Sequence, residues 1–397
     1  MQDDMEDYRT KFIESWQDNS QYFEMLRLLA SLSKLFSESA TPYLDYRIAE
    51  NLFCKYYSAI NDARSCTAFD ARLGKLGIGI KTFGIQKGNS VEKIAEFNKL
   101  KPVLDELNGK KLAIQLAQFR NDRIQVANNT YDLENSIYHI VGRSKGTLKI
   151  FNTDYELIDI DDIHEIRDSQ TSISFISGNC FYNFNKSKSV LMKKFTLPDQ
   201  YKEIPVEILA DPLQLLSELL QEEGKANITD ITKNKIFKGY DYVVLPLYST
   251  KGKDIRVPEK SGLNQWNAGG RRRDENEVYI PVPSEIHKKY PDFFPDRDTP
   301  FELILPNGTN LSAKICQENG KALMSNPNSD LGEWILRKVL RKKPGELVTI
   351  NDLAKYGIDS VRIEKKHRKN ENNEEVFEIS FTTSEYENYN EFINEEI

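Results

Sequence analysis

The spacing of apolar residues changes near residue 240, and this change limits the possible folds more than any other feature of the sequence. Before it, segments such as residues 24–36 repeat apolar residues about every 3.6 positions, which predicts amphipathic helices. Beyond Tyr240, short apolar runs alternate with Pro and Gly, which is typical of a small sandwich or barrel. A chain of 397 residues has room for both. We therefore expect an α/β (α+β) domain followed by a mostly-β domain.

Charge divides the chain further. Residues 371–397 hold nine Glu and no Lys or Arg, so the net charge of −7 arises in this segment and the rest of the chain is slightly basic. Ten Lys and Arg against six Asp and Glu lie between residues 231 and 280. Total charge thus hides a local basic region that can face a nucleic acid. The predicted parts are a first domain (1–223), a linker (224–239), a second domain (240–365) and an acidic tail (366–397).

The first domain begins with predicted helices over residues 8–60. Thr41-Pro42 is the expected start of the helix that carries Glu50, with Thr as N-cap. Glycines in 67–83 predict two short strands joined by a tight turn. A helix with Ser90 as N-cap is expected next and would carry Glu96, whereas residues 110–120 fit either a strand or a helix.

The hairpin over residues 67–83 places an acid beside a lysine. Asp70 falls on its first strand and Lys81 on its second, and a tight turn brings the two side by side. This segment resembles the PD-(D/E)XK nuclease family, whose pattern is an Asp, a hairpin, and then an acid two residues before a Lys. The chain departs from that pattern at Gly79, which stands where the second acid is expected.

The resemblance implies a central mixed sheet flanked by helices and a Mg²⁺ site. Asp70, Glu50 and Ile80 would hold the metal, because Mg²⁺ prefers hard oxygen ligands. Glu50 is the favoured replacement for the missing acid, with Glu96 the alternative. The first domain as a whole looks like the nuclease half of certain type II restriction enzymes, and Arg120 and Arg123 would add DNA contacts.

Residues 261–308 and 313–336 carry the most specific pattern of the chain. They resemble the DNA-recognition domain of some restriction endonucleases, which is similar to the plant B-three domain and to the effector domain of EcoRII, a seven-stranded pseudobarrel. The family holds the major groove with two arms, which correspond to residues 262–273 and 317–328. Amides suit adenine and Arg suits guanine. The candidate DNA-binding residues of the two arms are Asn264, Gln265, Trp266, Asn267, Arg271, Arg272, Arg273, Gln317, Asn319, Lys321, Ser325, Asn326 and Asn328.

These resemblances imply a sequence-specific endonuclease of a restriction–modification system that cuts double-stranded DNA with Mg²⁺. A homodimer is expected because two strands are cut, and a cognate DNA methyltransferase is the expected companion. Two alternatives remain open: an endonuclease that requires a modified base, and a DNA-binding regulator with an inactive nuclease fold. Scattered cysteines and the lack of a long apolar run indicate a cytoplasmic protein without a membrane span.

Overall fold

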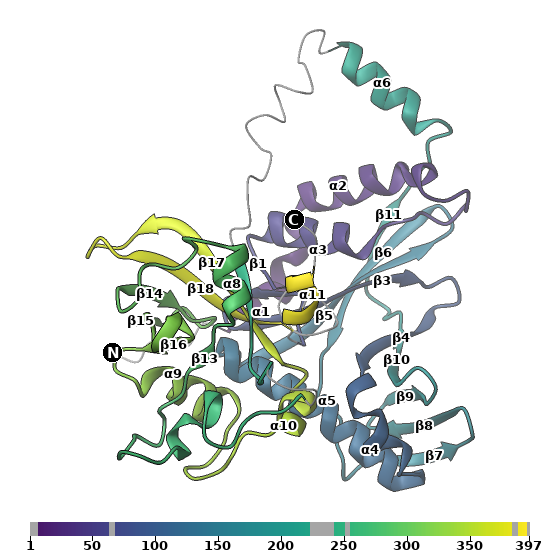
Figure 1. The fold of residues 1–397 in the computed structure, drawn as a ribbon. Coiled ribbons are helices and arrows are strands. Elements are labelled where there is room, and N and C mark those ends of the chain that lie inside the picture. Colours follow the sequence, from purple (N-terminus) through teal and green to yellow (C-terminus); the bar gives the residue numbers. More distant parts are fainter. Residues whose placement is uncertain (1–6, 63–67, 223–241, 251–254, 383–387, 395–397) are drawn as a thin grey trace, which may run out of the picture. The chain divides into compact units, whose positions relative to one another are not determined.

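The chain folds into two compact units. The computed structural model describes all residues except 1–6, 63–67, 223–241, 251–254, 383–387 and 395–397, so the expected linker lies outside the described residues (Figure 1). Unit 1 comprises residues 1–61, 69–117 and 134–239, and unit 2 comprises residues 62–68, 118–133 and 240–397.

A six-stranded mixed sheet forms the centre of unit 1. Its strands follow the order β1-β2-β3-β5-β6-β11, and β3 and β5 run parallel while the other neighbours are antiparallel (Figure 1). The strands are β1 (Ile60–Asn61), β2 (Ala71–Leu73), β3 (Leu76–Gly84), β5 (Asn135–Ser144), β6 (Thr147–Asp154) and β11 (Lys202–Pro205).

Helices cover one face of this sheet. They are α1 (Tyr8–Ser15), α2 (Ser20–Ser31) and α3 (Tyr46–Tyr57), and their contacts run to β5, β11 and β3 respectively. Alternate residues of β3, Leu76, Ile78 and Ile80, join the apolar core with these helices, as the period of two in a strand requires. Short helical turns η1 (Trp16–Asp18) and η2 (Ser33–Leu35) link the first helices.

A second, antiparallel sheet of five strands contacts the six-stranded sheet on the face opposite to the helices. Its order is β4-β10-β9-β8-β7, and Phe195 of β10 contacts Phe83 of β3 and Tyr138 of β5. The strands are β4 (Asn89–Glu96), β7 (His164–Asp168), β8 (Ser172–Ser177), β9 (Cys180–Asn185) and β10 (Val190–Thr196). The remaining helical elements of the first part of the chain are η3 (Asn98–Leu100), α4 (Lys101–Asp105), α5 (Gly109–Tyr131) and α6 (Pro212–Glu222).

Two local expectations for unit 1 are wrong. The segment after Ser90 is strand β4 and not a helix, because seven of its residues pair with β10 and this ladder outweighs the helical spacing of its apolar residues. The helix that carries Glu50 starts at Tyr46 and not at Thr41-Pro42. Asp45 is its N-cap, and its side chain accepts the N–H of Arg47 at 2.9 Å. Residues 110–120 are helical within α5.

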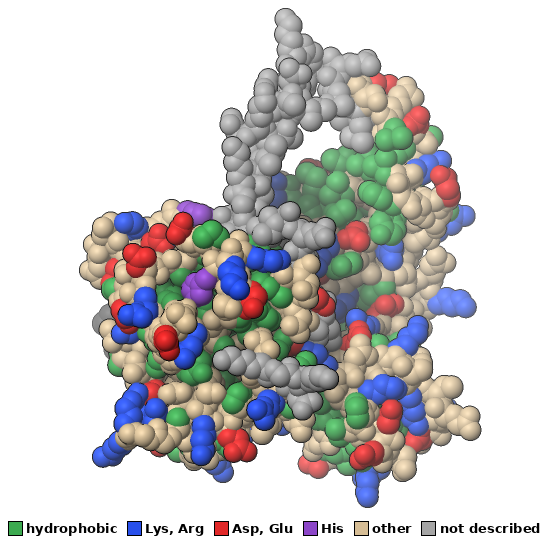
Figure 2. Space-filling model, viewed as in Figure 1, with side chains coloured by type: hydrophobic (Ala, Val, Ile, Leu, Met, Phe, Trp, Pro, Cys, Tyr) green, Lys and Arg blue, Asp and Glu red, His purple; other side chains and the backbone are tan. Residues whose placement is uncertain are grey.

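Apolar side chains gather on the surface of unit 1 over α2 and the segment that follows it (Figure 2). Leu28 of α2 is 48% exposed and Phe36 is 65% exposed, and Leu213 of α6 is 64% exposed.

No helix in the described part of the chain is long and apolar enough to cross a bilayer. Three cysteines, Cys54, Cys180 and Cys316, are free thiols, and Cys66 lies outside the described residues.

Unit 2 is built on a seven-stranded sheet, which confirms the number of strands expected for the second domain. The order is β12-β17-β18-β14-β15-β16-β13, and the two edge strands β12 and β13 contact each other, so the sheet curls into a barrel-like shape. The strands are β12 (Tyr242–Pro246), β13 (Ile280–Pro281), β14 (Pro300–Ile304), β15 (Asn310–Cys316), β16 (Ala322–Ser325), β17 (Ser360–Lys369) and β18 (Glu375–Thr382).

Helices fill and flank the curled sheet. Trp334 stacks on Phe381 of β18 with ring centroids 5.2 Å apart and lies in the apolar core of the unit. The helical elements are η4 (Gly262–Asn267), α8 (Ser284–Lys289), η5 (Glu318–Gly320), α9 (Asp330–Gly332), a π-helical turn η6 (Glu333–Val339), α10 (Ile350–Tyr356) and α11 (Tyr389–Asn394). The acidic segment after residue 365 supplies the end of β17, all of β18 and α11, so much of it belongs to the barrel and is not a separate tail.

Residues 118–133 also belong to unit 2. They are the C-terminal part of α5, which ends at Tyr131, and the two residues that follow it. Val126 is 5% exposed and lies in the apolar core of the barrel. Asp122 pairs with Lys355 of α10 at 3.0 Å, and the Asn129 side chain accepts a hydrogen bond from Arg341 at 2.7 Å. The barrel is therefore completed by a segment that precedes it in sequence by more than a hundred residues, which the sequence pattern did not predict.

Candidate functional site

The β2–β3 hairpin fixes Asp70 against the edge of β3. Gly74 lies in the turn at φ +56°, a conformation that favours glycine. The N–H of Asp70 donates to the carbonyl of Ile78 at 2.9 Å, and the N–H of Ile80 donates to the Asp70 Oδ2 atom at 2.7 Å. β2 begins at Ala71, which pairs with Ile78, so no residue of β2 faces Ile80 and the Asp70 side chain takes the place of that partner.

The carbonyl of Ile80 points to the same edge. In a strand the N–H and C=O of one residue face the same neighbour, and the N–H of Ile80 faces Asp70. This edge therefore offers a backbone oxygen beside a carboxylate. The expectation that Ile80 contributes to a metal site is compatible with this geometry.

Glu50 of α3 supplies a second carboxylate. It is only 5% exposed, its Oε2 atom lacks a hydrogen-bond partner among the described residues, and Arg47 Nη1 lies 3.9 Å from that oxygen. Burial raises the pKa of Glu50 to about 7, and the nearby charge of Asp70 adds to the increase. An acid that is buried without full hydrogen bonding is costly to ionise. A cation beside Glu50 would lower this cost.

Lys81 completes a group of three charged side chains. Burial also raises the pKa of the partly buried Asp70, while the charge of Lys81 opposes that increase for both Asp70 and Glu50. The structure thus brings Asp70 and Lys81 of the hairpin near each other, and Glu50 lies close enough for both charges to act on it. Shifted pKa values of neighbouring groups are common at functional sites.

Gly79 cannot carry the acid that the family pattern requires at its position. A Cβ atom there would lie 2.7 Å from Tyr155 Cε2 and 2.9 Å from Tyr138 Cδ1. These two rings stack with centroids 4.0 Å apart, so the space is filled by a rigid pair. Any second carboxylate beside Asp70 would have to come from another element, and Glu50 of α3 lies close enough for the Asp70 charge to act on it.

Glu96 and two predicted DNA contacts are placed elsewhere. Glu96 lies on β4 in the other sheet, its carboxylate accepts from Lys93 at 2.9 Å and from Asn98, and it is not among the charges that shift the pKa of Glu50 or of Asp70, whereas Asp70 acts on Glu50. The alternative that Glu96 replaces the acid loses its basis, since its helix does not exist. Arg120 is 2% exposed, so it is an interior residue and not one that DNA can reach, and Arg123 lies against Gly357.

The donor set at the hairpin fits a hard divalent cation. Glu50 and Asp70 offer carboxylate oxygens and Ile80 offers a carbonyl, which are the ligand types that Mg²⁺ takes. Only two of these donors are acidic, and within the described ranges no group of three or more His, Cys, Asp or Glu side chains is arranged to hold a metal. A bound Mg²⁺ would thus keep several waters and bind substrate oxygens.

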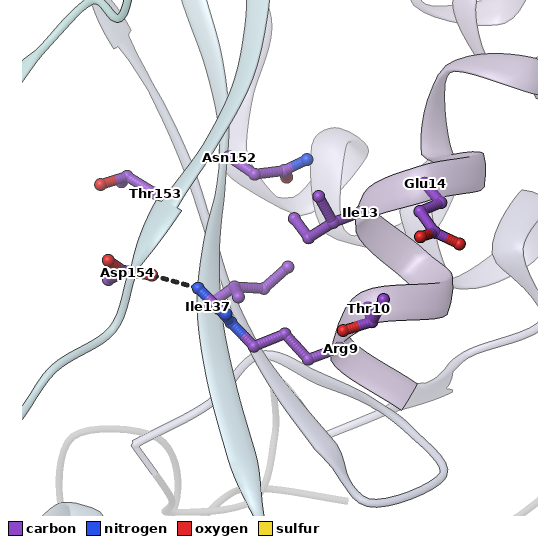
Figure 3. Close-up of a pocket in the computed structure, with 8 residues that line it drawn as sticks. All are labelled: Arg9, Thr10, Ile13, Glu14, Ile137, Asn152, Thr153 and Asp154. Atoms are coloured by element: carbon purple, nitrogen blue, oxygen red, sulfur yellow. Dashed lines mark hydrogen bonds and ion pairs between the residues drawn. The ribbon is translucent and has the colours of Figure 1, made fainter. Parts of the chain in front are cut away.

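A hollow of about 260 Å³ lies apart from this group, between α1 and the β5–β6 pair (Figure 3). Arg9 and Asp154 face each other across it and pair at 2.5 Å. Its lining residues are Arg9, Thr10, Ile13, Glu14, Ile137, Asn152, Thr153 and Asp154. None of Glu50, Asp70 and Lys81 lines it, and its main opposite charges already neutralise each other.

In unit 2, the first predicted arm, residues 262–273, contains both structural and exposed side chains. Asn264 is 1% exposed and serves the fold: its side chain donates to the carbonyls of Pro258 and Val348 and accepts the N–H of Val348 at 2.9 Å. The prediction that Asn264 reads a base is therefore wrong. Trp266 packs against the barrel core, Gln265 is half-buried, and Asn267 is exposed with its amide on the carbonyl of Glu259.

The three arginines of this arm differ from one another. The Arg273 side chain is 13% exposed, and its Nη1 atom donates to the carbonyls of Ala268 and Gly269 at 2.6 and 2.7 Å. Arg271 pairs with the buried Glu277 at 2.5 Å, although its side chain is 54% exposed. Arg272 is exposed. Glu277, which sequence reasoning missed, is recognisable only as an acid four residues after Arg273.

The second predicted arm, residues 317–328, occupies both ends of β16. Ser325 is 1% exposed and holds the chain internally, donating to Pro327 and accepting from Leu331, so it is not a base contact. Gln317, Asn319 and Lys321 precede β16. Asn326 and Asn328 follow β16 and are exposed. β13 pairs with β16 in antiparallel fashion, Ile280 with Leu323 and Pro281 with Ala322, so the chain between the first arm and β13 approaches β16 at the end that precedes Asn326.

One family comparison agrees with this architecture. Residues 243–367 match the model described as the NgoFVII C-terminal B3-like DNA-binding domain. No curated protein matches the chain. The match covers about a third of the sequence, spans both arms, and makes this part of the chain similar to the DNA-binding domain of a restriction enzyme.

Proposed function

We propose that the chain is a site-specific double-stranded DNA endonuclease of the restriction type. Unit 2 would read the sequence, and the group of Glu50, Asp70 and Lys81 would cut. The observation that carries the proposal is that a buried glutamate of α3 lies close enough to an aspartate and a lysine of the β2–β3 hairpin for their charges to shift its pKa. Support for DNA as the substrate comes from the match of residues 243–367 to a B3-like DNA-binding domain.

Each member of the group has a role in this proposal. Glu50, Asp70 and the Ile80 carbonyl would hold Mg²⁺, which when bound supplies charge to the phosphate and lowers the pKa of water. Asp70 is kept in place by the N–H of Ile80. Lys81, whose charge acts on both Glu50 and Asp70, would orient water or stabilise the phosphate. Cutting two strands needs two such sites, so a homodimer is part of the proposal.

A DNA-binding regulator is the second candidate. It is favoured by Gly79, whose position is closed to an acidic side chain by Tyr138 and Tyr155. Such a protein would bind its site but leave the DNA intact at any Mg²⁺ concentration.

Plasmid digestion separates the candidates. The purified chain is incubated with unmodified plasmid and with plasmid carrying 5-methylcytosine, each with Mg²⁺ or with EDTA. We expect discrete fragments with Mg²⁺ and none with EDTA. Cutting of modified plasmid alone would identify a modification-dependent enzyme, and binding without any cutting would identify a regulator. Fragments from unmodified plasmid would also support a companion DNA methyltransferase, since the host genome would need protection.

A further inference from the structure

We infer that Arg272 is the guanine-reading arginine of the first arm and that Glu277 is the residue that positions it. This inference rests on the proposed function, because it assigns a division of labour within the DNA-reading domain. It starts from the different surroundings of three consecutive arginines, Arg271, Arg272 and Arg273. To read guanine, an arginine needs two free N–H groups on one edge of its guanidinium, which face the O6 and N7 atoms.

Arg273 lacks such an edge. Its Nη1 atom donates to the carbonyls of Ala268, Gly269 and Arg271 at 2.6, 2.7 and 3.3 Å, and its Nε atom faces Glu277 Oε1 at 3.4 Å. One edge therefore has its Nη1 atom bonded to backbone carbonyls, and on the other edge the Nε atom is buried beside Glu277 without a hydrogen bond. At 13% exposure the side chain acts as an internal clasp that holds the 268–271 backbone.

Arg271 is tied to the same acid. Its Nη2 atom donates to Glu277 Oε1 at 2.5 Å, and its Nη1 atom donates to the carbonyl of Arg272 at 3.2 Å. Glu277 is 3% exposed, and a buried carboxylate that loses its arginine is costly. Arg271 would have to abandon that partner in order to read a base, although its exposed side can still face a phosphate.

Arg272 remains available. It is exposed, and no hydrogen bond or ion pair holds its side chain within the part of the chain that the structure describes. Its backbone lies between the two arginines that Glu277 binds. Further along the same loop, after Arg273, Arg337 of η6 donates to the carbonyl of Glu275 and to the Asn276 side chain, both at 2.7 Å. The loop is thus braced on both sides, and a fixed backbone orients Arg272 with little loss of entropy on binding.

The test is the selection of binding sites from a library of randomised duplexes by the full chain in EDTA, so that no DNA is cut. Arg272→Gln should lose the preference for guanine at one position, by about 5- to 150-fold, and keep the other positions. Arg271→Gln should lower affinity for all sequences and abolish no preference, since Arg273 still lies beside Glu277. Glu277→Gln should weaken the same guanine preference. The affinity of this variant for random duplex should not fall, since the substitution removes a negative charge that repels DNA.

The matched control is Glu275→Gln, which makes the same change of charge two residues away at an exposed side chain. It should leave the guanine preference intact. Thermal unfolding shows whether Glu277→Gln is folded, and if it is not, Arg272→Gln, an exposed substitution, still decides the assignment. Unchanged preferences in Arg272→Gln, or the loss of a base position in Arg271→Gln, would overturn the inference. A wild-type chain without any preference would instead refute the proposed function.

Discussion

The N–H of Ile80 donates to Asp70 Oδ2 at 2.7 Å, so the side chain of an aspartate replaces the partner strand at the edge of β3. This bond ties the candidate catalytic group to the hairpin that carries it. The Ile80 carbonyl faces the same edge, and the charge of Lys81 acts on both Asp70 and Glu50, while that of Asp70 acts on Glu50.

The first prediction concerns the stability cost of Glu50. Its pKa of about 7 lies above the ordinary value of 4.5, so the folded protein prefers the protonated acid. Stability is then complete below pH 4.5 and falls as the pH rises to about 7, by roughly 1–3 kcal/mol after allowance for solvent screening. In metal-free buffer at pH 8, Glu50→Gln should raise the free energy of unfolding by that amount, measured with urea. At pH 4 the difference should vanish. An unchanged or lower stability at pH 8 would show that Glu50 has a partner that satisfies its charge.

The second prediction links Glu50 to the metal. If Glu50 and Asp70 hold Mg²⁺, adding Mg²⁺ should raise the thermal midpoint of the wild type, since a ligand that binds only the folded state stabilises it. The increase should shrink below pH 7, where Glu50 is protonated. Glu50→Gln should lose it, and Glu96→Gln should keep it because Glu96 lies on another sheet. The opposite ranking of the two variants would place the metal at β4.

The third prediction separates structural amides from reading amides. Asn264→Ala leaves the N–H and carbonyl of Val348 and the carbonyl of Pro258 without partners, so unit 2 should lose at least about 2 kcal/mol. Asn328→Ala, at an exposed position, should change stability by less than about 0.5 kcal/mol. Denaturant unfolding of the two variants measures the difference. Equal stability would mean that the Asn264 contacts are dispensable.

The fourth prediction concerns the segment that completes the barrel. Val126→Asp would place a charge in the apolar core of unit 2, which costs several kcal/mol. The matched control is Val103→Asp on α4, where the side chain is 47% exposed. Calorimetry should show a lower unfolding temperature for Val126→Asp alone. For the same reason a fragment of residues 240–397, which lacks residues 118–133, should be less stable than unit 2 in the full chain. Equal unfolding temperatures would show that α5 only rests on the barrel.

Local signals in the sequence predicted the hairpin well. Glycines at the turn and apolar residues on both sides specify β2 and β3, and the distance between Asp70 and Lys81 then follows from strand geometry. The seven strands of unit 2 were expected because residues 261–308 and 313–336 resemble a DNA-recognition domain that is a seven-stranded pseudobarrel.

Long-range packing decided the features that the sequence did not predict. Residues 89–96 carry helical spacing but pair with β10, which lies a hundred residues further along the chain. Asn264 and Ser325 have the polarity of surface loop residues, yet each satisfies buried backbone groups. Glu277 and the place of Val126 in the barrel core depend on contacts that no local pattern records.

Cleavage and binding measured together in one preparation test the central claim most directly. Wild type, Asp70→Ala and Lys81→Ala are compared for plasmid cutting with Mg²⁺ and for duplex binding in EDTA. We predict that the wild type cuts, that both variants lose cutting by at least about a hundredfold, and that all three bind DNA equally, since these residues act on phosphate and water. Cutting at the wild-type rate by either variant would contradict the account and move the active site away from the β2–β3 hairpin.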